Sequence, residues 1–240
     1  MQRLRSFAFN AVLWSSGAVL SIWCMLIGRY FRDGILRNAQ LWARISLWAL
    51  RVFCGITVEA RGLDRLPPGG CVIAAQHQSA LDILLWLTLL PRPAFVFKKE
   101  LTRIPIFGAL LEPSGMIRVD RGGGRKALRD MVAGAHAAVA DGRQVVIFPE
   151  GTRVAPGVKG QLRHGIAALA QGLRAPLIPA TTDTGVRWGR AAFNTQPGPV
   201  HITLHDALPP DLPREALLDR LSQLYYGAPA RAFSDQSEML

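Results

Sequence analysis

The sequence predicts an α/β protein whose mostly parallel mixed sheet is flanked by helices and preceded by an N-terminal membrane-associated two-helix segment. One observation is a change near Thr57, after which short apolar runs alternate with helical patterns. Another is that the preceding residues form a long apolar segment followed by an amphipathic one. We therefore expect a membrane-embedded or interfacial helical segment over residues 1–56, an α/β domain over 57–226 and a loose C-terminal tail over 227–240.

The composition suits one domain that meets an anionic partner. The chain has 240 residues, 50% of them apolar, and a net charge of +11 carried mainly by arginine. Such a chain suits nucleic acid, an anionic membrane surface or a phosphorylated substrate. Nucleic acid is not expected as a partner, because no recognised motif supports it and the N-terminus is apolar. The widely spaced cysteines indicate buried reduced thiols, with no disulfide framework and no metal site: Cys24, Cys54 and Cys71.

The first apolar segment, residues 7–28, is nearly free of charge. As a helix it would be about 33 Å long, enough to cross or enter a hydrocarbon core. The segment is not expected to be a cleaved signal peptide, because no Ala-x-Ala cleavage site is seen. Positive charge flanks the segment on both sides, so a single span and a re-entrant hairpin with both ends in the cytoplasm are equally good interpretations. The flanking arginines are Arg3, Arg5, Arg29 and Arg32.

The second segment, residues 35–57, has an amphipathic pattern. Arg37, Arg44 and Arg51 recur every seven residues and therefore share one helical face. This pattern is typical of a helix at a membrane interface, with its arginines toward phosphate headgroups. The alternative is an ordinary amphipathic helix packed on the α/β domain. We favour the interfacial interpretation because the preceding segment is so apolar.

The remaining elements follow from apolar runs and helical periodicity. The expected strands are 57–60, 71–75, 94–97, 116–119, 144–148, 176–180 and 201–205. The expected helices are 80–89, 104–111, 124–140, 163–172 and 214–225. Because most strand–helix alternations are intact, we expect a mainly parallel sheet covered by helices.

His77 and Asp82 are the candidate catalytic pair. His77 follows a buried strand pattern, and a helix pattern begins at Leu81, so His77 lies on a strand-to-helix turn. Within one helix, residues five apart point about 140° away from each other. With His77 on the turn and Asp82 in the first helical turn, the two side chains can meet. The carboxylate would then fix the imidazole tautomer and leave the other nitrogen free to take a proton.

The same residues have a structural interpretation. Ser79-x-x-Asp82 matches a helix capping box with Ser79 as the N-cap. The two interpretations are compatible, and capping does not explain His77. The sequence has no Gly-x-Ser-x-Gly elbow and no obvious active-site cysteine. The histidine is therefore expected to activate a hydroxyl of the substrate.

A second candidate site follows the strand at 144–148. Pro149 ends the strand, Gly151 allows close approach of a backbone, and Glu150 and Arg153 supply charge. If the strands are parallel, this loop lies at the same edge as His77, where Arg153 could bind phosphate bidentately. The alternative is a surface turn with a Glu–Arg salt bridge.

Two further strands end in cations and could complete an anion pocket. Lys98 and Lys99 follow one strand, and Arg121 follows the other, which contains Arg118. The alternative for any one of them is a solvated basic residue. The glycine run 122–124 before a helix could bind phosphate but suits a flexible connector better.

Together these residues resemble the 1-acyl-sn-glycerol-3-phosphate acyltransferase (lysophosphatidic acid acyltransferase) family. Four blocks occur in the family's order between about residues 57 and 208. They are His77-x4-Asp82; Lys98-x-Glu100-Leu101 with Pro105, Gly108, Gly115 and Asp120-Arg121; Phe148-Pro149-Glu150-Gly151-Thr152-Arg153; and Pro176-Leu177-Ile178-Pro179.

The resemblance implies acyl transfer from acyl carrier protein or acyl-CoA to the free sn-2 hydroxyl of lysophosphatidic acid, giving phosphatidic acid in phospholipid biosynthesis. His77 would be the general base and Asp82 would orient it. Lys98 and Arg121 would hold the phosphate, and Pro179 would help form the acyl side of the pocket. The acceptor site would be shaped by Glu150, Gly151, Thr152 and Arg153.

The resemblance also implies the partners and the location. Membrane lipids and the acyl thioester are the expected partners, at the cytoplasmic face of the inner membrane, with no metal and no other cofactor. Three departures from the family pattern bear on the identity of the acceptor: Gln76, His164 and Asp183. One alternative is the same chemistry on another lysolipid such as lyso-ornithine lipid; a weaker one is a non-enzymatic basic membrane-surface protein. Three histidines match no block and are interpreted as structural: His136, His201 and His205.

Overall fold

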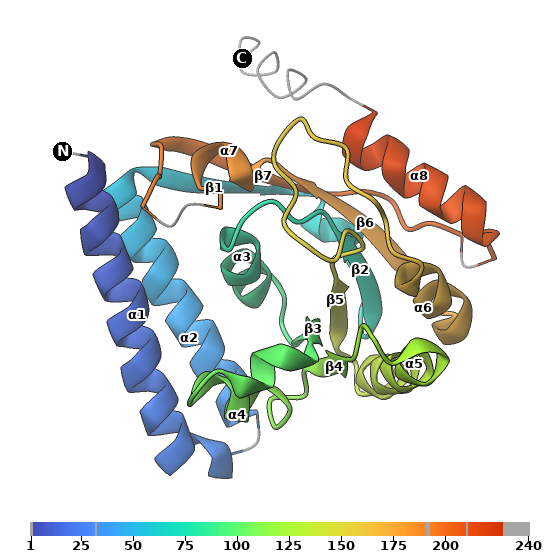
Figure 1. The fold of residues 1–240 in the computed structure, drawn as a ribbon, viewed down its shortest axis with the longest axis horizontal. Helices are drawn as coiled ribbons and strands as arrows, with labels where there is room; N and C mark the ends of the chain where they lie inside the picture. Colours follow the sequence, from blue (N-terminus) through green and yellow to red (C-terminus); the bar gives the residue numbers. More distant parts are fainter. Residues whose placement is uncertain (1, 32, 191–192, 210, 228–240) are drawn as a thin grey trace.

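The computed structural model describes residues 2–31, 33–190, 193–209 and 211–227. A twisted sheet runs through the molecule, with helices on both of its faces (Figure 1). The predicted α/β class with a mostly parallel sheet is confirmed. Apart from Gly227, the predicted loose tail lies outside the described residues.

Seven strands form the sheet in the order β1-β7-β6-β2-β5-β3-β4. All neighbouring pairs are parallel except β6 and β7. The expected strands are all present, with no end displaced by more than three residues. Their bounds are β1 Ile56–Arg61, β2 Cys71–Ala75, β3 Pro93–Lys98, β4 Ile117–Val119, β5 Gln144–Ile147, β6 Leu177–Thr182 and β7 Gly198–Leu204.

The helices also follow the expected pattern, except that the short helix Thr184–Arg187 was not expected and one other helix begins later than expected. The helix expected over residues 104–111 begins only at Phe107. Ile104 precedes a proline, which disfavours helical backbone, and Ile106 has a positive φ of 65°. The bounds are α1 Gln2–Leu26, α2 Gly34–Ala49, α3 Leu81–Leu89, α4 Phe107–Leu111, α5 Gly124–Ala140, α6 Gly165–Leu173, α7 Thr184–Arg187 and α8 Arg214–Tyr226.

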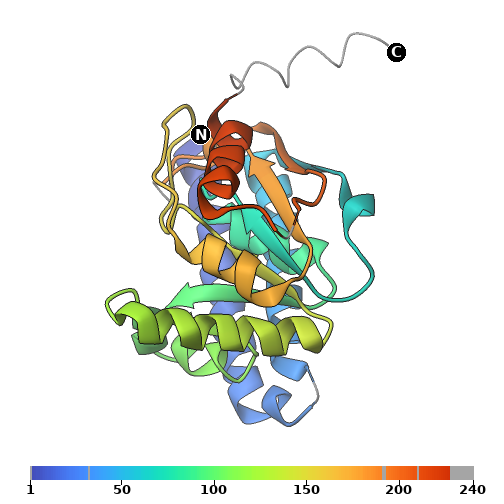
Figure 2. The ribbon, with the colours of Figure 1, turned by 90° about the vertical axis from the view of Figure 1, so that its right-hand side faces the viewer.

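Two apolar cores cover the two faces of the sheet. Strand β2 is central and wholly buried, so its side chains supply both cores alternately. Ile73 joins the core under α1, α2 and α3, whereas Val72 and Ala74 join the core under α5, α6 and α8. Figure 2 looks onto this second set of helices. The N-terminal helices therefore lie on the opposite side of the sheet from α5, α6 and α8.

Helix α1 is long and apolar enough to cross a membrane by length and composition. At 25 residues it is about 37 Å long. Much of its surface is apolar and exposed, through Leu4, Phe7, Trp14, Val19, Ile22, Trp23 and Leu26. A large exposed apolar patch marks a surface that meets a partner or a membrane.

Helix α2 packs on the rest of the protein along one face and exposes the other. It packs against α1 and α3 and buries Leu36 and Ala43. Its remaining surface exposes Trp48, Arg37 and Arg44, and the third arginine predicted to share their face, Arg51, is exposed in the turn that follows α2. The helical pattern continues as a π-helical turn over Leu50–Cys54 before β1 begins.

Replacement of Arg143 by methionine should destabilise the sheet edge. The buried Arg143 guanidinium donates hydrogen bonds to the carbonyl oxygens of Pro93 at 2.7 Å and of Ser114 and Gly115 at 3.0 Å. Arg143→Met leaves three acceptors unpaired, so we expect a loss of about 3 kcal/mol in the free energy of unfolding. Denaturant unfolding of the purified protein measures this loss.

Arg118→Met is the matched control. Arg118 is 58% exposed and pairs with Glu112 at 3.1 Å, so its replacement should cost less than about 1 kcal/mol. Equal losses in the two variants would contradict the role given to Arg143.

Candidate active site

His77 lies at the carboxyl edge of the central strands, as the sequence predicts. Strand β2 ends at Ala75 and α3 begins at Leu81, so His77 occupies the connecting loop. Parallel α/β sheets place their ligands and chemistry at this edge. The loop after β5, which contains Glu150 and Gly151, reaches the same edge.

Asp82 binds the His77 ring directly. The Nδ1 atom of His77 lies 2.8 Å from Oδ2 of Asp82, and Asp82 is fully buried. The same Oδ2 accepts the backbone N–H groups of Gln78 at 2.8 Å and Ser79 at 2.9 Å. Ser79 Oγ accepts the backbone N–H of Leu81 at 3.1 Å. One carboxylate therefore binds both the histidine and two backbone N–H groups of the turn before α3, whose N-cap residue is Ala80 rather than the expected Ser79.

This arrangement assigns the tautomer of a neutral His77. Because a carboxylate oxygen faces Nδ1, the ring donates its proton there and leaves Nε2 as an acceptor. Within the described part of the chain, Nε2 has no hydrogen-bond partner. The ring stacks on Phe148 with centroids 4.0 Å apart and an interplanar angle of 21°, and the His77 side chain is 16% exposed. Stacking and the Asp82 bond leave a fixed, accessible Nε2 that can take a proton.

The loop after β5 holds the backbone of His77 on both sides. His77 donates its backbone N–H to Oε2 of Glu150 at 2.6 Å. The carbonyl oxygen of His77 accepts the backbone N–H of Val154 at 2.8 Å. One bond to the Glu150 carboxylate and one backbone bond from Val154 thus join the His77 loop to the loop after β5, which restricts how the His77 loop can move.

Glu150 is buried beneath this loop, with only 2% of its surface exposed. Its other oxygen, Oε1, accepts the hydroxyl of Tyr226 from α8. Burial raises the pKa of Glu150 to about 7, against the opposing effect of the bonds from Tyr226 and His77. Its predicted part in shaping the acceptor site stays a prediction; its contacts in the structure are with the His77 backbone and Tyr226.

Gly151 and Arg121 lie together next to the His77 loop. Gly151 has a φ of +66°, a left-handed backbone that favours glycine. A Cβ atom on Gly151 would lie 3.7 Å from Cζ of Arg121 and 3.4 Å from Cγ of Arg163. The exposed Arg121 guanidinium thus approaches the backbone of Gly151, as expected for an anion site at this edge. Thr152 is exposed, and Arg153 is half-buried and accepts a bond from Arg190 through its carbonyl oxygen.

Lys98 and Pro179 are the two remaining residues predicted to bind substrate, and they lie on different strands. Lys98 ends β3 in register with Val119 of β4, so it shares the sheet edge with Arg121. Its ammonium lies 3.7 Å from a carboxylate oxygen of Glu100. Pro179 is buried in β6 opposite Ala74 of β2, two strands whose ends reach the site. The substrate-binding roles of both residues stay predictions.

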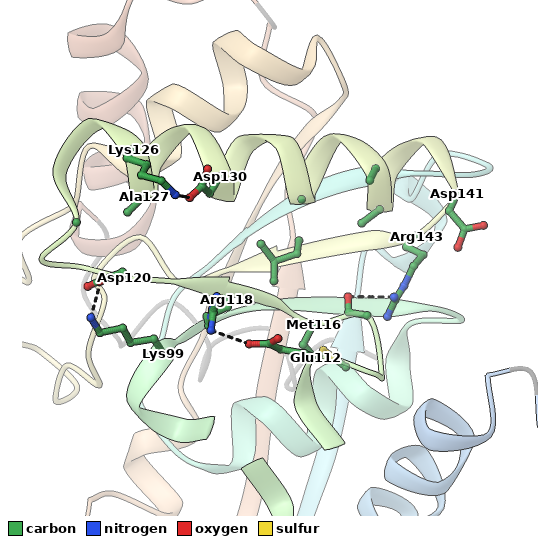
Figure 3. Close-up of a pocket in the computed structure, with 16 residues that line it drawn as sticks. Lys99, Glu112, Met116, Arg118, Asp120, Lys126, Ala127, Asp130, Asp141 and Arg143 are labelled. Carbon is green, nitrogen blue, oxygen red and sulfur yellow. Dashed lines mark hydrogen bonds and ion pairs between the residues drawn. The ribbon is translucent and has the colours of Figure 1, made fainter. Parts of the chain in front are cut away.

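A cavity of about 760 Å³ lies beside the site, between β4 and α5 (Figure 3). Neither His77 nor Asp82 lines it. Six of its charged residues form ion pairs with each other: Lys99 with Asp120, Arg118 with Glu112, and Lys126 with Asp130. The Lys99 ammonium lowers the pKa of Asp120, so this carboxylate stays charged beside Arg121.

Two residues of the site carried no sequence signal of their own. The buried Thr184 of α7 donates its hydroxyl to Oδ1 of Asp82. Tyr226 of α8 donates to Glu150. Both lie far along the chain from their partners, and a threonine or a tyrosine at a helix end is common in proteins. Thr184 lies just after the fourth block, and this nearness was the one available sign.

Comparisons with known proteins place the chain among acyltransferases. The family model described as Acyltransferase matches residues 57–183. The chain is 32% identical over 213 residues to the 1-acyl-sn-glycerol-3-phosphate acyltransferase of Pseudomonas aeruginosa, covering 87% of this chain and 82% of that protein. It is 30% identical over 188 residues to the chloroplastic enzyme BAT2 of Brassica napus, covering 75% of this chain and 53% of that protein.

A solved structure shares the fold. The crystal structure of the 1-acyl-sn-glycerophosphate (LPA) acyltransferase PlsC from Thermotoga maritima superposes with a TM-score of 0.75. The sequences are 20% identical, and the match covers 95% of each chain. The match therefore extends over the N-terminal helices as well as the sheet.

The buried Glu150 should make stability depend on pH. Its pKa is about 7 in the folded protein against an ordinary 4.5, so between these values the folded state binds the proton more tightly than the unfolded state. Its contribution to stability is thus complete below 4.5 and is lost as the pH rises through 7, a change of about 3 kcal/mol. Glu150→Gln should remove this change.

Denaturant unfolding of both proteins at several values between pH 4.5 and pH 8 checks this expectation. As the pH rises, the free energy of unfolding of the wild type should fall steadily relative to that of Glu150→Gln. A difference that is independent of pH would contradict the raised pKa.

Proposed function

The chain belongs to the Acyltransferase family and is an acyltransferase, and we propose that it acylates the free sn-2 hydroxyl of lysophosphatidic acid. The donor would be the thioester of acyl carrier protein or acyl-CoA, and the product would be phosphatidic acid. The observation that carries this proposal is the 2.8 Å bond between His77 and the buried Asp82, with Arg121 beside the neighbouring loop. The printed names of the relatives support the same acceptor.

The reaction needs one base and no protein nucleophile. Nε2 of His77 takes the proton from the lysolipid hydroxyl as the oxygen attacks the thioester carbonyl carbon. The new carbon–oxygen bond gives a tetrahedral intermediate. The carbon–sulfur bond then breaks, and the leaving thiolate takes the proton back from His77. The base is thus regenerated.

Asp82 serves both proton transfers. Its carboxylate accepts Nδ1–H throughout, so it holds the ring in one orientation and stabilises the imidazolium that forms between the two steps. The carboxylate stays fixed because its other bonds come from Gln78, Ser79 and Thr184. No step requires Asp82 to become protonated.

Arg121 is the best-placed group for the phosphate of the acceptor. Its guanidinium is exposed and approaches Gly151. A guanidinium can bind two phosphate oxygens at once, which fixes the headgroup as well as attracting it. Lys98 at the end of β3 would add a second positive charge from the same edge.

A membrane location suits a lipid acceptor. Helix α1 meets the length and composition of a spanning helix and exposes apolar side chains, and α2 adds exposed arginines. We propose that these helices hold the enzyme at the cytoplasmic face of the inner membrane, where apolar side chains enter the bilayer and arginines meet phosphate headgroups.

His77→Ala should remove the activity without unfolding the protein. General-base catalysis contributes about 100-fold to 10,000-fold to the rate, so kcat for transfer to lysophosphatidic acid should fall by at least about 100-fold. The measurement is radiolabelled acyl transfer in detergent by purified enzyme. His136→Ala, an exposed histidine of α5, should keep full activity. Retained activity in His77→Ala would refute the assignment of the base.

Arg121→Gln should weaken binding of the phosphate in particular. Loss of a charge-assisted bond of about 1.5–3 kcal/mol raises KM for lysophosphatidic acid by about tenfold to 100-fold, with a smaller effect on kcat. Arg129→Gln, an exposed arginine on α5, is the control and should leave KM unchanged.

A matrix of acyl donors and acceptors run on the same proteins tests the acceptor. Lysophosphatidic acid should be the preferred acceptor of the wild-type enzyme. Preference for a phosphate-free acceptor such as lyso-ornithine lipid would contradict the roles of Lys98 and Arg121 and favour that alternative.

A further inference from the structure

Asp183 and His201 form a second histidine–aspartate pair, at the end of β6 and on β7. Asp183 accepts the backbone N–H of His201 through Oδ1 at 2.6 Å. Its other oxygen lies 2.7 Å from Nδ1 of the His201 ring. The backbone N–H of Asp183 donates to the carbonyl oxygen of His201 at 3.3 Å. Three hydrogen bonds therefore join these two residues, and both side chains are mostly buried, with 14% of His201 and 22% of Asp183 exposed.

The pair lies where a strand becomes a helix. Strands β6 and β7 are antiparallel, and their register ends with Thr182 opposite Ile202. Asp183 follows β6 as the N-cap residue of α7, which has only four residues. So short a helix has little stability of its own, so the flanking contacts must set its position. The bonds to His201 provide such a contact from β7.

The first two residues of α7 touch the His77 loop. Thr184 donates its hydroxyl to Oδ1 of Asp82, the oxygen that does not face His77. Gly185 donates its backbone N–H to Oε1 of Gln78 at 3.2 Å. A Cβ on Gly185 would lie 2.9 Å from Cβ of Gln78, so no larger residue fits at this contact. The start of α7 therefore packs closely against the loop that carries the base.

We infer that Asp183 and His201 are positioning residues for the catalytic base, acting through Thr184 on Asp82. This inference rests on the proposed role of His77. The His201 ring holds Asp183, Asp183 sets the first turn of α7, and that turn places the Thr184 hydroxyl on the buried carboxylate. Without the hydroxyl, Oδ1 of Asp82 loses its side-chain donor, and a buried carboxylate with a missing donor shifts toward other partners. The His77 ring would follow, because it is bonded to the same carboxylate.

Residues that position the base and residues that only stabilise the fold affect the kinetics differently. Loss of positioning lowers kcat and has little effect on substrate binding, since the phosphate and the acyl chain of the lysolipid make most of its contacts with the enzyme. A displacement of a catalytic group by about 1 Å can cost about 100-fold in rate. We therefore expect His201→Ala to lower kcat by about tenfold to 100-fold, with KM for both substrates within about twofold of wild type.

Three variants make the readout specific. His201→Asn keeps a side-chain N–H near the position of Nδ1, so it should recover most of kcat. Thr184→Val removes only the hydroxyl and should lower kcat as His201→Ala does, whereas Thr184→Ser should keep it. The double variant His201→Ala with Thr184→Val should be no slower than the slower single variant, because both act through one bond.

His205→Ala is the matched control. His205 follows the same strand, is partly buried and bonds a β6 threonine, Thr181, at 3.0 Å. It should keep wild-type kcat and KM.

The experiment is steady-state kinetics in detergent on all variants, with unfolding midpoints measured in parallel and His77→Ala as reference. Full activity in Thr184→Val, or losses that multiply in the double variant, would overturn the inference even if His201→Ala fails to fold. Activity retained in His77→Ala would instead overturn the proposed base. The two failures are therefore distinguishable.

Discussion

The site depends on one buried carboxylate and the donors around it. Asp82 has no exposed surface, and an ionised carboxylate in such a place is unfavourable unless its oxygens are hydrogen-bonded. Four donors meet this requirement: the ring of His77, the backbone of Gln78 and Ser79, and the hydroxyl of Thr184. The carboxylate holds all four donors in place, and one of them is the ring of His77. The orientation of the base is therefore fixed by its bond to Asp82. The geometry is therefore set before any substrate binds, which is the condition for efficient proton transfer.

The segments that supply these contacts are far apart in the sequence. Glu150 binds the His77 backbone from 73 residues away, and Thr184 binds Asp82 from 102 residues away. The sheet brings them together because β2 lies between β5 and β6 and the three strands are parallel. Beyond α7, Trp188 meets Phe9 of α1 in an edge-to-face contact with centroids 5.1 Å apart. The helix that supports Asp82 is thus also attached to the apolar N-terminal helix, which links the catalytic edge to the surface proposed to meet the membrane.

Local patterns predicted the elements and the contact between His77 and Asp82 well, because those depend on near neighbours. Strand β2 and helix α5 have the predicted bounds, and His77 and Asp82 lie five residues apart on one turn. The predicted start of α4 was wrong, because Pro105 disfavours helical backbone before it and Ile106 has a positive φ, although the residues here follow an apolar helical pattern. Thr184, Tyr226 and the pairing of Asp183 with His201 could not be predicted, since each depends on strand order and on a partner far along the chain. His201 was interpreted as structural; its bonds to Asp183 are what now connect it to the site.

The central claim is that Asp82 holds His77 with its proton on Nδ1 and leaves Nε2 free to act as the base. Nitrogen NMR of the enzyme labelled with ¹⁵N-histidine tests it directly, because the ring shifts and couplings distinguish the two neutral tautomers. The signal that disappears in His77→Ala identifies the residue. At a pH where this ring is neutral, the account predicts a protonated Nδ1 and a bare Nε2. A proton on Nε2 of the neutral ring would contradict it.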